Sequence, residues 1–216
     1  FICAEVEVTP ESHLDAYVKT DENGDPVIDE DGDTVWVAKV ISDGLVSLGG
    51  EVSPDGKEIW GWQPLAYNAE GIPYADPVSS YIPTSNDLDR DGDGKPDSWP
   101  EGWYNEILKE FKWPGALRQG ASNSDMESFF VFDDRTNKEF EYYPFPDDST
   151  RKGLGIEIES RYYQWANPLA EDIIFLIYKV TNKSQKDLNE VMFGMWGDPH
   201  VGGPSNWQDD LSYFDR

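Results

Sequence analysis

The sequence predicts an all-β protein, mainly an antiparallel β-sandwich of the immunoglobulin-like or jelly-roll-like type, with one long loop and one short helix. Short stretches with strand patterns are separated by Asp-, Asn- and Gly-rich turns, and they do not alternate with helical segments. We divide the chain into an N-terminal hairpin or meander (1–60), an aromatic-rich loop region (61–120) and the main sandwich strands (121–216). The first region either stands alone or completes the same sandwich.

The N-terminal region begins with a strand pattern, AEVEV at residues 4–8, in which every second residue is apolar. Two acidic turns follow, DENG at 21–24 and DEDG at 29–32, eight residues apart. Asn-Gly and Asp-Gly pairs supply the positive φ angles of tight hairpin turns, so we expect a meander of three short strands here. Calcium ligation by these turns is the weaker alternative, because neither turn keeps a full alternating Asp spacing.

The middle region holds the long loop and the predicted helix. Residues 64–100 are rich in Pro, Asp, Ser, Asn and Gly, and a stretch of this length without periodicity is usually functional. The segment YNEILKEFKW (Tyr104–Trp113) predicts the helix, because Ile107, Leu108 and Phe111 would share one face. A Pro-Gly pair directly after this segment would end the helix.

The second half of the chain is rich in strand patterns. Candidate strands follow one another with the sequences ESFFVFDD, EFEYYPF, LGIEIESRYYQW, DIIFLIYKVTN and NEVMFGMWGD. The stretch from Ile173 to Val180 is almost continuously apolar, which is typical of a central strand covered on both faces. We therefore expect this stretch to lie inside the sandwich.

The charge of the chain argues against several classes of partner. Lys and Arg total 17 against 43 Asp and Glu, which gives a formal charge of −26. This field repels phosphate backbones and anionic membranes, so we expect no nucleic-acid partner, and it favours cations and a calcium-rich exterior. No apolar run approaches about eighteen residues, so we expect no direct membrane insertion.

Cys3 is the single cysteine, which rules out a disulfide within the chain. The chain begins at Phe1 without a signal peptide, and we interpret it as a mature or excised piece of a longer protein.

The most specific motif is the nine-residue stretch DRDGDGKPD, which runs from Asp89 to Asp97. Its Asp residues alternate with other residues ahead of a Gly, so several carboxylates can point into one centre. Calcium is a hard cation that takes about six to eight oxygen ligands, and it would offset the repulsion among these anions. The alternative is a solvated acidic turn. The candidate calcium ligands are the side chains of Asp89, Asp91, Asp93 and Asp97 and the backbone carbonyl of Lys95, with Asp87 starting an alternative register.

This motif resembles the calcium loops of thrombospondin type 3 repeats, D-x-D-x-D-G-x-x-D, and more distantly those of dockerins and EF-hands. It departs from the EF-hand at the twelfth position, where an EF-hand has Glu and this chain has Pro100. The resemblance implies a lone structural calcium loop rather than a sensor hand. A second acidic cluster near the C-terminus, Asp198, Asp209 and Asp210, is a weaker calcium candidate, because its Asp-Pro and Gly-Gly neighbours are ordinary turn formers.

No catalytic motif accompanies these carboxylates. The two His residues lie apart from any nucleophile motif, and no G-x-S-x-G, P-loop or dinucleotide-binding motif occurs. We therefore expect no enzymatic activity, with a carboxylate-based glycoside hydrolase as the residual alternative. Aromatic rings around the acidic motif are candidates for stacking on sugars, and the simpler interpretation is that they fill a core beneath the long loop. These rings are Trp60, Trp62, Trp99, Trp103 and Trp113.

The segment from residue 151 to 203 is similar to stretches of long secreted bacterial surface proteins, many of which carry C-terminal sorting domains for type IX secretion. In those proteins a strand ending in Y-x-V-T-N precedes V-x-F-G-x-W-x-D-P-x-V-G, and the resemblance covers residues 99–215. It implies an extracellular location and points to no particular enzymatic activity. His200 stands where an acidic residue often follows Pro, which weakens the second calcium candidate. The matching residues here are Tyr178, Val180, Thr181, Asn182, Val191, Phe193, Gly194, Trp196, Asp198, Pro199, Val201 and Gly202.

Together these observations predict a non-enzymatic, calcium-stabilised structural or adhesive module of a larger bacterial surface protein. Two alternatives stay open: a carbohydrate-binding module that uses exposed Trp and Tyr, and a subunit of an extracellular filament or surface layer. The expected partners are other domains of the same polypeptide, glycans, or neighbouring surface-protein subunits.

Overall fold

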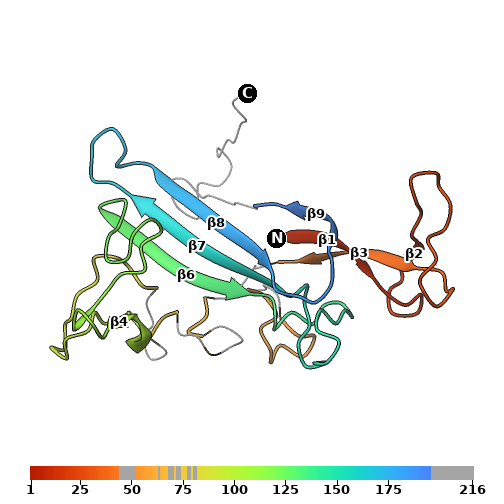
Figure 1. The fold of residues 1–216 in the computed structure, drawn as a ribbon, viewed down its shortest axis with the longest axis horizontal. Coiled ribbons are helices and arrows are strands. Elements are labelled where there is room, and N and C mark those ends of the chain that lie inside the picture. The colour runs from red at the N-terminus through yellow and green to blue at the C-terminus, as the bar shows by residue number, and fades with distance from the viewer. Residues whose placement is uncertain are drawn as a thin grey trace.

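The computed structural model describes residues 1–43, 52–62, 64–67, 71, 74–76, 79 and 82–195. The chain is nearly all antiparallel β-structure, which confirms the predicted fold class (Figure 1). The strands are β1 (Ile2–Glu7), β2 (Tyr17–Val18), β3 (Trp36–Ser42), β4 (Tyr104–Asn105), β5 (Glu110–Phe111), β6 (Met126–Asp133), β7 (Ile156–Gln164), β8 (Ile174–Asn182) and β9 (Asn189–Phe193), with one 3-10 turn, η1 (Glu101–Trp103).

The first sheet joins the two ends of the described chain. Its strand order is β2-β3-β1-β9, so β1 lies between β3 and β9 and pairs with both in the antiparallel sense. Ile2 is opposite Ser42 on one side and Phe193 on the other. The strands of the N-terminal region therefore share a sheet with β9, which comes from the last third of the sequence.

The second sheet has the order β6-β7-β8 and is also antiparallel throughout. Alternation along β7 sends Ile156 and Ile158 to one face and Arg161 and Tyr163 to the other, and all four side chains are buried. Both faces of β7 are thus covered, and each face has its own core.

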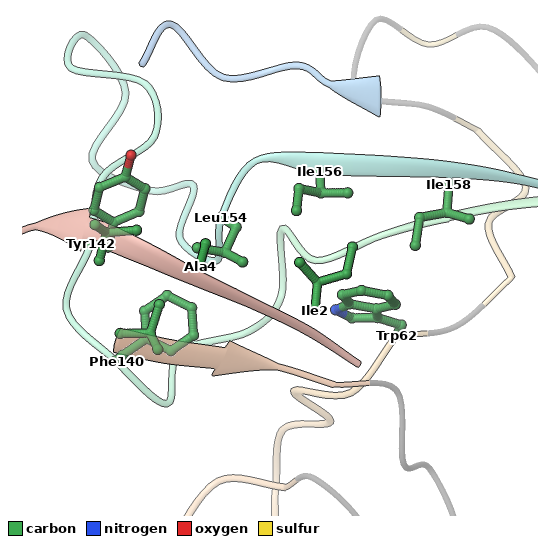
Figure 2. Packing of buried hydrophobic residues seen from close by; sticks show 10 residues of the cluster. Ile2, Ala4, Trp62, Phe140, Tyr142, Leu154, Ile156 and Ile158 are labelled. Atoms are coloured by element: carbon green, nitrogen blue, oxygen red, sulfur yellow. The ribbon is translucent and has the colours of Figure 1, made fainter. Parts of the chain in front are cut away.

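The main core lies between the two sheets (Figure 2). Ile2, Ala4 and Val6 of β1 pack with Ile156 and Ile158 of β7, since strand alternation points both sets inward. Trp62 closes this core together with Phe140, Tyr142 and Leu154, which come from the long segment between β6 and β7.

The second core covers the opposite face of β6 and β7 with the long loop. Phe129 and Val131 of β6 pack against Trp99 and Trp113. The loop is tied to β6 through backbone hydrogen bonds, from Leu65 N to Val131 O at 2.8 Å and from Phe129 N to Pro83 O at 3.0 Å. This arrangement fixes the position of the acidic motif, which immediately precedes Trp99.

The helix predicted over Tyr104–Trp113 is wrong. The segment forms the small hairpin of β4 and β5 instead, directly after η1. The Asn105 side chain accepts hydrogen bonds from the backbone N–H groups of Ile107 and Leu108, both at 3.0 Å, and this local turn competes with a helix. Lys109 then adopts a positive φ of 55°, which a helix does not allow.

The expectation for the apolar stretch Ile173–Val180 is also wrong. It forms β8, which ends the three-stranded sheet, and most of its side chains are exposed rather than covered on both faces. Its sequence is that of a buried strand, yet among the described residues it is covered only in part, by the packing of Tyr178 against the main core and of Phe175 against Trp165.

Candidate metal centre

The acidic motif brings three carboxylates together. Asp89, Asp91 and Asp97 each offer an oxygen, and these oxygens all lie within 4.8 Å of one another. Asp89 and Asp91 are exposed and Asp97 is half-buried, so a cation can reach the cluster from solvent. Hard oxygen ligands at this spacing suit calcium, which takes its ligands at about 2.3–2.6 Å.

The loop around the cluster is held in shape by Asp side chains and by glycine. Asp89 accepts hydrogen bonds from the backbone N–H groups of Gly92, at 2.6 Å, and Gly94, at 2.9 Å. Both glycines have positive φ, 81° and 93°, which side chains with a Cβ rarely adopt. The sharp turn expected from Gly94 is therefore present.

The structure separates the two registers that the sequence left open. Asp87 lies outside the triad, because Ser98 donates to Asp87 Oδ2 from its backbone N at 2.8 Å and also from its hydroxyl. The other oxygen, Oδ1, accepts from Leu88 N at 2.8 Å. These bonds fasten the start of the loop to its end, and they favour the register that begins at Asp89.

Asp93 and Lys95 occupy different places from the triad. Asp93 accepts a 2.8 Å hydrogen bond from the backbone N of Lys95 and is not brought together with the other carboxylates. The Lys95 ammonium is buried, pairs with Asp76, and donates to the backbone carbonyl of Trp99 at 3.1 Å. Burial opposes this charge, yet the hydrogen bond and charge of Asp76 raise the pKa of Lys95 above its usual value.

Arg90 places a cation beside the carboxylates. Its backbone N donates to Asp97 Oδ1 at 2.9 Å, and its Nη1 donates to Asp97 Oδ2 at 2.6 Å and to Asp87 Oδ1 at 3.1 Å. The Arg90 backbone and guanidinium lower the pKa of Asp97, so this carboxylate stays ionised. A metal ion would share Asp97 with Arg90 or displace the guanidinium.

The Trp side chains serve mainly as core. Trp99, Trp103 and Trp113 form a cluster with ring centroids 5.4–5.7 Å apart, in which Trp99 and Trp113 are buried. Trp62 is buried in the main core, and its Nε1 donates to Ser42 Oγ at 2.9 Å. Trp60 is half-buried and donates to Glu58 at 3.2 Å. These rings do not form a flat exposed platform of the kind that stacks on sugars.

The second acidic cluster cannot be placed. Asp198, Asp209 and Asp210 lie outside the described residues, as does His200.

A hollow of about 530 Å³ opens between the two sheets. Ile41 of β3, Phe132 of β6 and Tyr178 of β8 line it with Phe193 of β9, and Asp43 is the only charged side chain among its described lining residues. The hollow lies where β8 and β9 end their sheets, so the core is open on that side.

Asp134 is a buried carboxylate that sequence reasoning did not single out. It has no exposed surface and accepts hydrogen bonds from Leu154 N at 2.5 Å, Gly155 N at 3.1 Å and Ile156 N at 3.0 Å. Ser42 Oγ donates to it as well, at 3.1 Å, so Asp134 ties β3 to the start of β7. Burial raises the pKa of Asp134 to about 6, although these donors oppose the shift.

A buried ion pair lies under the second core. Arg161 Nη1 donates to Glu127 Oε1 at 2.6 Å, and Glu127 has no exposed surface. The Arg161 guanidinium also lies 4.4 Å from the ring centroid of Phe129. The pair links the neighbouring strands β6 and β7, and removal of either partner would leave the other charge buried without a counter-charge.

Comparison with known proteins adds no family. No family model matches the chain, and no curated protein or solved structure matches it either. In the described part of the chain, no helix has the length and apolar character needed to cross a membrane.

Proposed function

We propose that this chain is a non-enzymatic structural or adhesive module of a larger surface protein, and that calcium stiffens it. The convergence of Asp89, Asp91 and Asp97 in one exposed loop carries the proposal. The strong acidity of the chain supports it, because a charge of −26 raises the local concentration of divalent cations.

An ion bound to this loop would stabilise more of the fold than the loop itself. Its two ends are tied by the bonds from Ser98 to Asp87 and by the 3.1 Å hydrogen bond from Asp97 N to Leu88 O. Lys95 anchors its middle to Asp76, and Trp99 enters the second core directly after it. An ion that holds residues 89–97 therefore also holds the aromatic cover of β6 and β7.

The expected gain follows from linkage between binding and folding. An ion that binds the folded loop but not the unfolded chain stabilises the fold by about 1.4 kcal/mol when its concentration is about ten times the dissociation constant. In a calcium-rich exterior the site would stay occupied, so the module would keep this added stability. This suits a structural or adhesive role. The proposed location is accordingly the cell surface or the extracellular space.

Calorimetric titration with calcium and with magnesium tests the proposal. We expect one calcium ion at the loop, weaker magnesium binding, and at least about tenfold weaker calcium binding for Asp89→Asn and Asp91→Asn. Asp29→Asn is the matched control, because Asp29 accepts backbone N–H bonds from Asp31 and Asp33 in an acidic turn but belongs to no triad. Calcium binding that is absent, or that the Asp29 variant reduces as much as the triad variants do, would contradict the site.

A further inference from the structure

Strand β8 leaves a long apolar edge free among the described residues. It is the last strand of the β6-β7-β8 sheet, and it pairs with β7 over its whole length without a register shift. Apolar side chains on both of its faces are exposed by 41–59% of their surface: Ile174, Phe175, Leu176, Ile177 and Val180. Figure 1 shows β8 at the outer edge of its sheet.

This edge lacks the devices that usually protect an edge strand. Natural edges are short, or carry Pro, bulges or several charges, because unpaired N–H and C=O groups invite another strand. β8 has nine residues, contains no Pro, and carries one charge, Lys179. Its pattern is that of a strand with a neighbour on each side.

The charges around β8 are ordered along the chain. Glu171 and Asp172 directly precede the strand, whereas Lys183 and Lys186 follow it. No acidic residue occurs between positions 173 and 186, although the chain has 43 of them. One end of the edge is thus acidic, whereas Lys183 and Lys186 lie at the other end, where Lys183 is 3.6 Å from Glu157 of β7 and Asp187 directly follows Lys186.

We propose that β8 is a site of self-association, in which the β8 strands of two copies pair antiparallel around a two-fold axis. Antiparallel pairing brings Glu171 and Asp172 of each copy beside Lys183 and Lys186 of the other, whereas parallel pairing would bring like charges together. The two three-stranded sheets then form one continuous sheet. Exposed apolar side chains of the two strands meet as cross-strand pairs on both faces.

The overall charge sets the conditions under which this pairing occurs. Two copies that each carry −26 repel each other at long range, and salt screens this repulsion over about 8–10 Å at physiological strength. The apolar contacts and backbone hydrogen bonds of paired strands are much less sensitive to salt. We therefore expect a dimer that strengthens as salt is added, up to the point where the flanking ion pairs are screened as well.

Sedimentation velocity over a series of protein concentrations tests the proposal on the whole chain. We expect the wild type to shift from monomer to dimer, and Leu176→Lys to raise the dissociation constant by at least about tenfold, because a charge would enter the apolar pairing. Leu108→Lys is the matched control, since Leu108 is 57% exposed in the β4-β5 hairpin, away from β8. A wild type that stays monomeric at every concentration and salt level would overturn the proposal, whatever else covers β8.

A charge exchange tests the direction and the location of the pairing. Glu171→Lys/Asp172→Lys and Lys183→Glu/Lys186→Glu should each dimerise more weakly than wild type, because like charges then meet at both ends of the edge. An equimolar mixture of the two variants should recover the dimer. Hydrogen exchange should also slow in the β8 amides on dimerisation. If the mixture does not recover the dimer, or if hydrogen exchange slows only in other segments, the association lies elsewhere and the proposal is wrong.

Discussion

Arg90 donates from Nη1 to Asp97 Oδ2 at 2.6 Å, so the loop that gathers three carboxylates also supplies a cation of its own. The guanidinium reduces the repulsion among the carboxylates when no metal is bound. It also occupies part of the coordination capacity of Asp97. Substitution of Arg90 should therefore strengthen calcium binding, whereas substitution of a residue of the Asp triad should weaken it.

The first prediction is that Arg90→Gln strengthens calcium binding severalfold. Removing the positive charge leaves Asp97 Oδ2 free for the ion, whereas the backbone N of residue 90 can still donate to Asp97 Oδ1. Calorimetric titration at fixed salt measures the change, and high salt should reduce it because the groups are exposed. Weaker binding in the variant would assign Arg90 the role of holding the loop in shape.

The second prediction concerns pH and Asp134. The folded pKa of about 6 lies above the unfolded value of about 3.9. The stabilisation that protonation supplies is therefore fully present below about pH 4 and is lost as the pH rises through about 6. The shift corresponds to about 3 kcal/mol between these limits.

Urea unfolding of the wild type and of Asp134→Asn at a series of pH values measures this effect. The other carboxylates titrate in both proteins, so the difference between their free energies of unfolding isolates Asp134. We expect the advantage of the wild type over the variant to shrink from pH 4 to pH 7. Two parallel pH profiles would show that the donors from Leu154, Gly155 and Ile156 hold the pKa near its ordinary value.

The third prediction compares two glycines with positive φ. A Cβ at Gly153 would lie 2.2 Å from Asp134 O, whereas a Cβ at Gly24 would meet nothing within 4 Å. Both residues have similar φ angles, 73° and 88°. Gly24→Ala should therefore cost about 1 kcal/mol for backbone strain alone, and Gly153→Ala roughly 3 kcal/mol or more. Equal losses in chemical denaturation would show that the turn at Gly153 moves freely.

The fourth prediction is that Arg161→Met destabilises the fold by about 3–5 kcal/mol, because it leaves the buried carboxylate of Glu127 without a counter-charge. The double variant Glu127→Leu/Arg161→Met should recover most of this loss, since no isolated charge remains. Denaturant unfolding of both variants measures the difference. A double variant as unstable as the single one would mean that the pair is needed for the register of β6 and β7.

The sequence predicted most of the strands and the acidic turns, because they depend on local chemistry, but the candidate strand EFEYYPF at residues 139–145 is not a strand in the structure. Asp21 accepts hydrogen bonds from Asn23 N and Asp25 N, and Gly24 has the positive φ that its Asn-Gly turn requires. The Asp89–Asp97 loop is equally local, since its spacing and glycines fix most of its shape. Three of its four predicted carboxylates converge.

The remaining predictions failed for separate reasons, one local and two that depend on tertiary structure. The apolar spacing of Ile107, Leu108 and Phe111 fits a helix. The Asn105 side chain instead accepts a hydrogen bond from Ile107 N and forms a local turn, and Ile107 is 91% exposed. The apolar pattern of β8 predicted a strand, but it could not show whether that strand lies at the centre or at the edge of the sheet. Asp134 has no local signal among 43 acidic residues, because its burial depends on donors about twenty positions away.

The calcium claim is tested most directly by thermal melts of the wild type and of Asp89→Asn, each in excess chelator and in calcium. We expect calcium at about ten times its dissociation constant to raise the wild-type melting temperature by roughly 3–6 °C, which corresponds to about 1.4 kcal/mol for a chain of this size. The Asp89 variant, with calcium binding at least about tenfold weaker, should shift by no more than about 1–2 °C between the two conditions. Superimposable wild-type melts at saturating calcium would reduce the loop to a solvated turn and contradict the account.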